Sequence, residues 1–229
     1  MFMPLYDGAP MVFLRQPIVN YSLIALNIAV FLAMNAGLFG DVERLDLALG
    51  AIPAVVVGHS SLAKGLGLVP EPLTLLTGLF IHAGWAHLIG NMLFLWVFGD
   101  NVEDAMGSAR YLAFYLACGI AGCLSYCVVD STSEAPLIGA SGAISGVVVA
   151  YMILYPRIRV LGLVLNILPL RLPALWCLGA WIATQLMSAL VAPRGDVGFW
   201  AHVGGIACGA ALTPLLRRAA APLFSSRRA

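Results

Sequence analysis

The stretch "PLIGASGAISGVVVAYMILYP" (residues 136–156) decides the fold, because a long uncharged apolar run begins here with an unusual head. Its first part, "GASGAISG" (139–146), holds three glycines and two serines. A helix that only had to span a membrane would carry leucine and valine at these positions. Ser141 is therefore either a small residue that lets helices pack closely or a nucleophile placed inside a membrane.

The composition of the whole chain supports a membrane location. Of its 229 residues 61% are hydrophobic and only 10% are charged, and the mean hydropathy is +0.95. Soluble domains carry about 25% charged residues, so the chain is expected to be an integral membrane protein. A net charge of +1 without a basic stripe argues against nucleic-acid binding. The five cysteines form no CxxC pair and cluster with no histidine, which favours buried apolar roles, with no metal and no cofactor.

Six charge-poor runs are long enough to cross a bilayer, which takes about 20 helical residues. They predict an all-α bundle of six transmembrane helices near 18–39, 86–106, 110–130, 137–156, 173–192 and 198–217. Residues 40–85 form a long first loop outside the cytoplasm, where prolines and glycines break the chain into interfacial half-helices. Residues 157–172 are interpreted as a cytoplasmic connector lying at the membrane interface. No internal repeat and no second domain is evident.

The basic residues predict the orientation, because cytoplasmic loops collect lysine and arginine. With residues 1–17 in the cytoplasm, the inner side holds most of them: Arg15, Arg110, Arg157, Arg159, Arg171, Arg217, Arg218, Arg227 and Arg228. The outer side holds Arg44, Lys64 and Arg194. Both termini are therefore expected to be cytoplasmic, flanking a six-span domain (18–217) with a flexible basic tail (218–229). We expect a multi-pass protein of a bacterial inner membrane.

The few polar side chains within the spans lie at one depth. In this topology His87, Ser141 and His202 each fall near the outer end of an even-numbered span, and Asn91 follows His87 by one helical turn. A serine needs a base to become a nucleophile, and neutral imidazole is the usual base near pH 7. We therefore expect a Ser141–His202 dyad for acyl transfer. His87, Asn91 and the Ser141 amide would stabilise the oxyanion.

The glycines in the same stretches predict close helix packing. Gly139 and Gly142 flank Ser141, and their lack of a side chain lets backbone or substrate approach it. The pairs Gly142/Gly146 and Gly205/Gly209 have the GxxxG spacing that lets two membrane helices touch backbone to backbone. The fourth and sixth spans are thus expected to pack together.

These motifs resemble those of the rhomboid family of intramembrane serine proteases, over nearly the whole chain. "GASGAISG" (139–146) is similar to its GxSG nucleophile motif, and "AHVGGIACG" (201–209) to the AHxGG segment that carries its general base. "HAGWAHLIGNMLFLWVFGDNVED" (82–104) is similar to its HxxxxHxxxN segment, which gives His82, His87 and Asn91. The resemblance implies Ser141 as nucleophile, His202 as base, His87 and Asn91 in the oxyanion hole, and His82 as support for the first loop.

The chain departs from the family pattern in two places. Thr74 stands in the region where many members carry a Trp-Arg pair, so Glu71 or Trp85 is expected to support the loop. Ser145 stands where some members place an aromatic side chain on the base, which leaves the orientation of His202 unexplained. Gln185 could face either the site or a neighbouring helix.

The function expected from these features is cleavage of transmembrane protein substrates within the lipid bilayer, near its outer face. Trp181 and Trp200 are candidates for lining a gate through which a substrate enters. Two alternatives remain open. One is a catalytically inactive rhomboid-like protein that binds membrane clients, since a fold does not fix an activity. The other is a small transporter or channel, although such proteins usually show internal repeats and charged midplane residues. The sequence predicts no oligomeric state.

Overall fold

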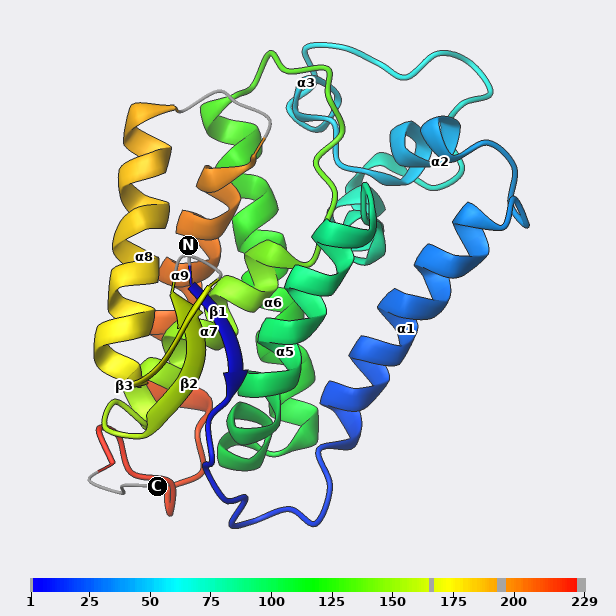
Figure 1. Ribbon diagram of the computed structural model, residues 1–229. Helices are drawn as coiled ribbons and strands as arrows, with labels where there is room; N and C mark the ends of the chain where they lie inside the picture. Colours follow the sequence, from blue (N-terminus) through cyan, green and yellow to red (C-terminus); the bar gives the residue numbers. More distant parts are fainter. Residues whose placement is uncertain (1, 165–166, 193–196, 226–229) are drawn as a thin grey trace.

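The chain folds into a bundle of long helices (Figure 1). The structure is a computed structural model that describes residues 2–164, 167–192 and 197–225. The long helices are α1 (Ile18–Asn35), α5 (Trp85–Met106), α6 (Ser108–Val129), α7 (Ser141–Leu154), α8 (Ala174–Val191) and α9 (Phe199–Leu216). The prediction of a mostly helical membrane protein is confirmed.

Length and composition support fewer complete membrane spans than six. Among the described residues α1, α6, α8 and α9 are long and apolar enough to cross a membrane. Helix α5 makes a fifth candidate when it is joined to the bent segment Glu71–Phe80 before it. Helix α7 has 14 residues and is about 21 Å long, short of the roughly 30 Å of hydrocarbon. The count of six full spans is therefore not confirmed, although a helix lies in each predicted region.

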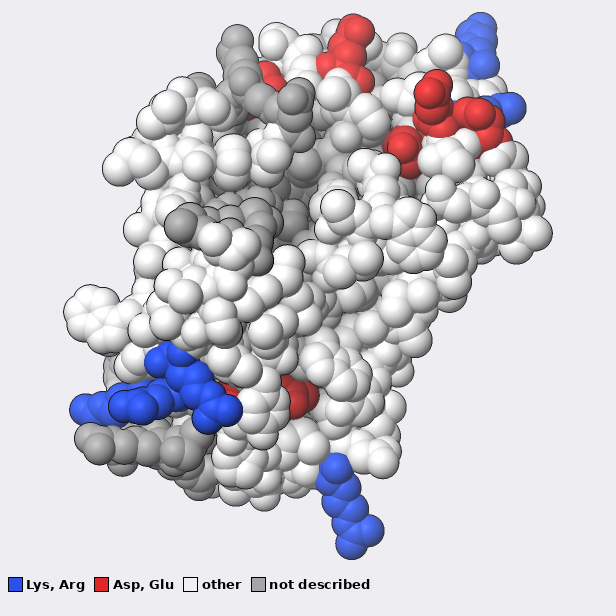
Figure 2. All heavy atoms as spheres, in the orientation of Figure 1, with Lys and Arg blue, Asp and Glu red and all other residues white. Residues whose placement is uncertain are grey.

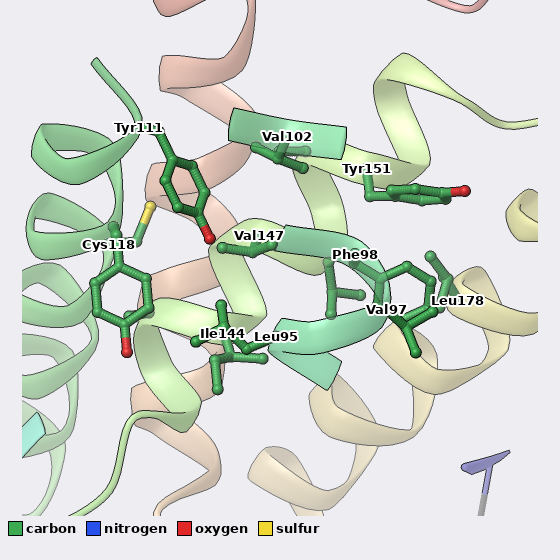
Figure 3. Close-up of a cluster of buried hydrophobic side chains, with 14 of the residues drawn as sticks. Leu95, Val97, Phe98, Val102, Tyr111, Cys118, Ile144, Val147, Tyr151 and Leu178 are labelled. Carbon is green, nitrogen blue, oxygen red and sulfur yellow. The ribbon is translucent and has the colours of Figure 1, made fainter. Parts of the chain in front are cut away.

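Helix α7 is short because it lies inside the bundle. It packs against α5, α6, α8 and α9, and its residues are buried from Gly142 to Tyr151. Side chains of α5, α6 and α8 meet it in one apolar cluster (Figure 3), which includes Leu95, Phe98, Tyr111, Cys118, Ile144, Val147 and Leu178. A helix that is apolar on all sides suits such a central position.

The first loop folds into short helices that cover one end of the bundle. They are α2 (Val42–Leu49), α3 (Pro53–Val56), η1 (Glu71–Leu73), α4 (Thr74–Thr77) and η2 (Gly78–Phe80). The backbone of Ala51 pairs with that of Leu137, and Gly139 N–H donates to the carbonyl oxygen of Gly78 at 2.8 Å. The expected supports contribute locally: the Glu71 carbonyl accepts a bond from Thr74, and the Trp85 ring packs on Phe31. The loop thus holds the segment that precedes α7.

A three-stranded antiparallel sheet, which the sequence analysis did not predict, accompanies the helical bundle. Strands β1 (Phe2–Tyr6), β2 (Arg159–Val164) and β3 (Leu168–Pro173) are ordered β1-β2-β3. The expected interfacial connector (157–172) is thus largely a hairpin. Its start alternates between exposed Arg157 and Arg159 and buried Ile158 and Val160, the period of a strand with one buried face. Pairing with β1 and β3 satisfies backbone groups that would otherwise be exposed at the membrane.

Both terminal segments dock on the same end of the bundle, at the C-terminal end of α5. Asp104 of α5 accepts backbone N–H bonds from Val12, Phe13 and Leu14. Beyond α9 the chain continues to contact the bundle, since Arg218 N–H donates to Ala105 O at 2.7 Å. The described part of the expected flexible tail is therefore docked. Arg194 and the rest of the tail, with Arg227 and Arg228, lie outside the described residues.

Candidate active site

Ser141 is the first residue of α7. The predicted span (137–156) begins before Ser141, but residues 137–140 precede the helix as non-helical chain. Figure 1 shows this segment descending from the end that carries α2 and α3 to the middle of the bundle. Its backbone bonds with the first loop hold it out of the helix. The N–H groups of the first turn therefore have no intrahelical acceptor, and the positive end of the helix dipole lies at Ser141.

His202 of α9 is in direct contact with Ser141. The Oγ of Ser141 lies 2.9 Å from Nε2 of His202, and Nδ1 of His202 lies 2.8 Å from Oε1 of Gln185 in α8. An amide oxygen only accepts hydrogen bonds, so Nδ1 carries the ring proton. Nε2 then holds the free lone pair, which accepts the Ser141 hydroxyl. His202 is only 8% exposed, and these two bonds give both nitrogens of the largely buried ring a partner.

Two aromatic rings pack against the His202 imidazole. Neither comes from position 145, which holds a serine where some members of the family have an aromatic side chain. The Trp181 ring lies nearly parallel to the imidazole, with centroids 6.4 Å apart. The Phe199 ring meets it edge-on at 5.9 Å. Ser145 instead donates its hydroxyl to the backbone oxygen of Ser141 at 2.7 Å. Of the two positions that the sequence allowed for Gln185, the structure shows the one facing the site. Its signal in the sequence is a lone amide within an apolar span.

The other expected polar residues lie on α5 or just before it, and those on α5 lie next to Gly139. Gly139 has φ +116°, and a Cβ at this position would come within 2.6 Å of Cε1 of His87 and 3.8 Å of Nδ2 of Asn91. Asn91 is buried, and its Nδ2 has no hydrogen-bond partner among the described residues. His82 is also buried, and its ring packs edge-on against His87 at 5.0 Å. Side-chain donors from α5 thus lie next to the backbone that precedes Ser141.

Glycines bring α7 and α9 into backbone contact. A Cβ on Gly209 would lie 2.6 Å from Cα of Gly146, and a Cβ on Gly205 would collide with the carbonyl of Gly142. Helix α6 joins the same contact, because a Cβ on Gly122 would lie 2.5 Å from the carbonyl oxygen of Ala201. Close approach of this kind fixes the depth of one helix against another. It places the starts of α7 and α9 within hydrogen-bond distance.

An open groove leads to these residues. It has a volume of about 1330 Å³ and is lined along one side by α5 and along the other by α8. Ser141, His202 and Gln185 line it, together with Asn91. Phe94 of α5 and Trp181 of α8 meet across it, with ring centroids 5.4 Å apart. Trp181 therefore lines the groove as expected for a gate residue, whereas Trp200 is not among its lining residues.

The two asparagines of α1 make hydrogen bonds within their own helix, and the described residues show no metal site. Asn27 and Asn35 of α1 donate to carbonyl oxygens one turn back in their own helix. All five cysteines are free thiols. Among the described residues no cluster of three histidine, cysteine or acidic side chains could hold a metal ion.

The fold and the site together define a multi-pass integral membrane protein with a serine and a histidine in contact beside an open groove. Comparison with known families gives the same result as the motifs. The profile of the Rhomboid domain matches residues 70–219, well over half of the chain. The chain belongs to the rhomboid family.

Several curated proteins resemble parts of the chain. It is 41% identical over 133 residues to rhomboid protease GluP of Bacillus subtilis (strain 168), which covers 57% of this chain and 23% of the relative. It is 30% identical over 146 residues to the mitochondrial rhomboid protein 1 of Saccharomyces cerevisiae, covering 60% and 40% of the two chains. A mouse mitochondrial presenilin-associated rhomboid-like protein is 35% identical over 91 residues, or 39% of this chain and 24% of the relative. The matched part is thus less than half of each relative.

Proposed function

We propose that this chain is an intramembrane serine endopeptidase that cleaves transmembrane segments of other membrane proteins near the outer face of the bilayer. The observation that carries the proposal is the 2.9 Å contact between Ser141 Oγ and His202 Nε2 at the groove between α5 and α8. The similarity to a bacterial protein named as a rhomboid protease supports the same reaction class.

The reaction begins with the Ser141 hydroxyl. His202 Nε2 takes the proton while Oγ attacks the carbonyl carbon of the scissile peptide bond. The carbon–nitrogen bond then breaks, and His202 returns the proton to the leaving amine nitrogen. The product is an ester between Ser141 and the new C-terminus. Water attacks this ester, gives its proton to His202, and releases a carboxylic acid as Ser141 regains its hydroxyl hydrogen.

The oxyanion that forms in each step needs donors already in place. The Asn91 side-chain amide is buried and unbonded among the described residues, so it is free to donate. The His87 ring and the Asn91 amide both lie next to the Cβ position of Gly139. The backbone N–H of Ser141, at the first turn of α7, adds a donor supported by the helix dipole. These three groups would bind the oxyanion.

The groove favours a transmembrane segment as the substrate. The groove lies between α5 and α8, where the Phe94 and Trp181 rings meet, and a lipid-embedded peptide would have to pass between these two helices. A helical backbone is fully hydrogen-bonded, so the scissile bond must first leave the helix. Substrates should therefore carry small or helix-breaking residues at the cleavage point.

The charge distribution supports cytoplasmic termini. Figure 2 shows basic side chains gathered at the end that carries the β2–β3 hairpin and the C-terminal segment. The end with α2 carries most of the visible acidic side chains and fewer basic ones. Basic residues favour the cytoplasmic side. The first loop then lies outside, and the dyad lies toward the outer half of a bacterial inner membrane.

The deciding experiment compares the chain with Ser141→Ala, reconstituted in liposomes with a fluorogenic transmembrane reporter. The parent should cleave the reporter and react with a fluorophosphonate, and Ser141→Ala should do neither. Undiminished cleavage by Ser141→Ala would show that Ser141 is not the nucleophile and would contradict the proposed function. A folded parent that binds the reporter without cleaving it would instead support the inactive, client-binding alternative.

A further inference from the structure

We propose that Gln185 is a third member of the site, a positioning residue that fixes the tautomer and direction of the His202 imidazole. This inference rests on the proposed function, because His202 needs positioning only if it acts as a base. The contact that carries it is the 2.8 Å bond between Nδ1 of His202 and Oε1 of Gln185. It joins α9 to α8 at the edge of the groove.

The neighbours of Gln185 determine which way its amide faces. Its Nε2 lies 3.4 Å from the carbonyl oxygen of Trp181 and 3.3 Å from Oγ1 of Thr184. Both atoms accept hydrogen bonds, and the Thr184 hydroxyl already donates to the Trp181 carbonyl at 2.6 Å. The NH₂ group therefore faces its own helix, and the oxygen faces His202.

This orientation leaves one tautomer for the imidazole. With the Gln185 oxygen as acceptor, the neutral ring must carry its hydrogen on Nδ1. Nε2 is then unprotonated and 2.9 Å from the hydroxyl that it has to deprotonate. The opposite tautomer would place a hydrogen between Nε2 and Ser141 Oγ and remove the base. Gln185 thus occupies the position that an acidic residue holds in a Ser-His-Asp triad.

A neutral partner suits this place in the molecule. Both ring nitrogens of His202 already have neutral partners, Ser141 and Gln185, and a buried carboxylate in a membrane helix carries a larger desolvation cost than an amide. The family position that could carry an aromatic ring against the base holds Ser145, whose hydroxyl bonds to Ser141 O. Gln185 and the Trp181 ring, both on α8, hold the imidazole instead.

The test replaces Gln185 in two ways and measures the reporter cleavage and the rate of fluorophosphonate labelling in liposomes. Gln185→Leu removes the acceptor at similar size. Gln185→Glu keeps an acceptor for Nδ1 but adds charge. Met187→Leu, on the same helix and 61% exposed, is the control for general changes in α8.

Gln185→Leu should lower kcat at least about tenfold, a part of the 10²–10⁴-fold that general-base catalysis contributes. KM and the unfolding temperature should stay near those of Met187→Leu. Gln185→Glu should approach the parent kcat at alkaline pH. The acidic limb of its pH–rate profile should move to higher pH, because a carboxylate favours the charged imidazolium. The other titratable groups that line the groove are unchanged in both variants: His87, Tyr126, Asp130 and Cys177.

A merely structural role for Gln185 would give a different result. If Gln185→Leu keeps the parent kcat, or if Gln185→Glu leaves the pH–rate profile in place, the inference is wrong even though Ser141→Ala is inactive. If Ser141→Ala remains active, the proposed function itself fails.

Discussion

Gly205 of α9 lies directly on the backbone carbonyl of Gly142 in α7, the residue that follows Ser141. No side chain fits between the two helices at this point. Because His202 is three residues before Gly205, the same contact fixes the distance between the imidazole and the Ser141 hydroxyl. Packing and chemistry therefore depend on the same few backbone atoms.

Gly205→Ala should push α7 and α9 apart and reduce both stability and activity. Overpacking of a tight interior usually costs about 1–3 kcal/mol. We expect a lower unfolding temperature and slower labelling of Ser141 by a fluorophosphonate. Gly179→Ala is the matched control, since a Cβ on that α8 glycine meets only Met152 Sδ, at 3.9 Å. Equal unfolding temperatures for the two variants would contradict the role of the Gly205 contact.

Gly139→Ala should inactivate the site by a different route. The new Cβ would come within 2.6 Å of the His87 ring, and φ at this position is +116°. Gly37→Ala provides the control, because Gly37 has φ +72° with no atom within 4 Å of its Cβ position. Backbone strain should cost both variants about 1 kcal/mol of stability, and the clash with His87 should add to this loss in Gly139→Ala. Only Gly139→Ala should stop reporter cleavage. If Gly139→Ala cleaves the reporter at the parent rate, His87 takes no part in the reaction.

The helical fold and the family could be predicted because apolar runs and closely spaced glycines are local signals. The position of Ser141 could not. Backbone bonds between the first loop and residues 137–139 end the helix at its start, and such bonds join segments far apart in the sequence. The sheet was missed for a similar reason, since β1 and β2 are separated by most of the chain. The contact of Gln185 with His202 could not be predicted, because a single amide on an apolar helix does not show whether its side chain faces the histidine or another helix.

Asn91→Ala should slow cleavage without preventing substrate binding. Loss of one oxyanion donor typically costs about 10²–10³-fold in kcat, whereas the ground-state carbonyl gains less from this amide. We therefore expect a large fall in kcat with a nearly constant KM in the liposome assay. Asn35→Ala is the control, because Asn35 donates to Phe31 O within α1 and lies away from the groove. A change in KM alone would show that Asn91 acts in binding.

Asp104→Asn should release the N-terminal segment. The carboxylate of Asp104 accepts three backbone N–H bonds, from Val12 at 2.7 Å, Phe13 at 2.8 Å and Leu14 at 2.6 Å. An amide would point its own N–H groups at one of these donors and leave it unpaired, at a cost of about 1–3 kcal/mol. Trypsin should then cut faster after the exposed Arg15, which mass spectrometry can follow.

The control for this variant is Glu134→Gln, at an exposed position near the other end of the molecule. It should leave the trypsin pattern unchanged. Protection of Arg15 in Asp104→Asn equal to that of the parent would mean that the sheet alone holds the segment.

Phe94→Ala should speed cleavage by widening the groove between α5 and α8. The Phe94 and Trp181 rings meet across it at 5.4 Å, and an aromatic pair contributes about 0.5–1.5 kcal/mol. Removing it should lower KM for the transmembrane reporter by about 2- to 10-fold, because less energy is needed to separate the two helices. The kcat should change little, since the His202–Gln185 bond remains. Trp96→Ala is the matched control, as Trp96 stacks on Tyr21 of α1 and is 56% exposed. If Phe94→Ala and Trp96→Ala have the same KM, the substrate reaches Ser141 by a path other than this groove.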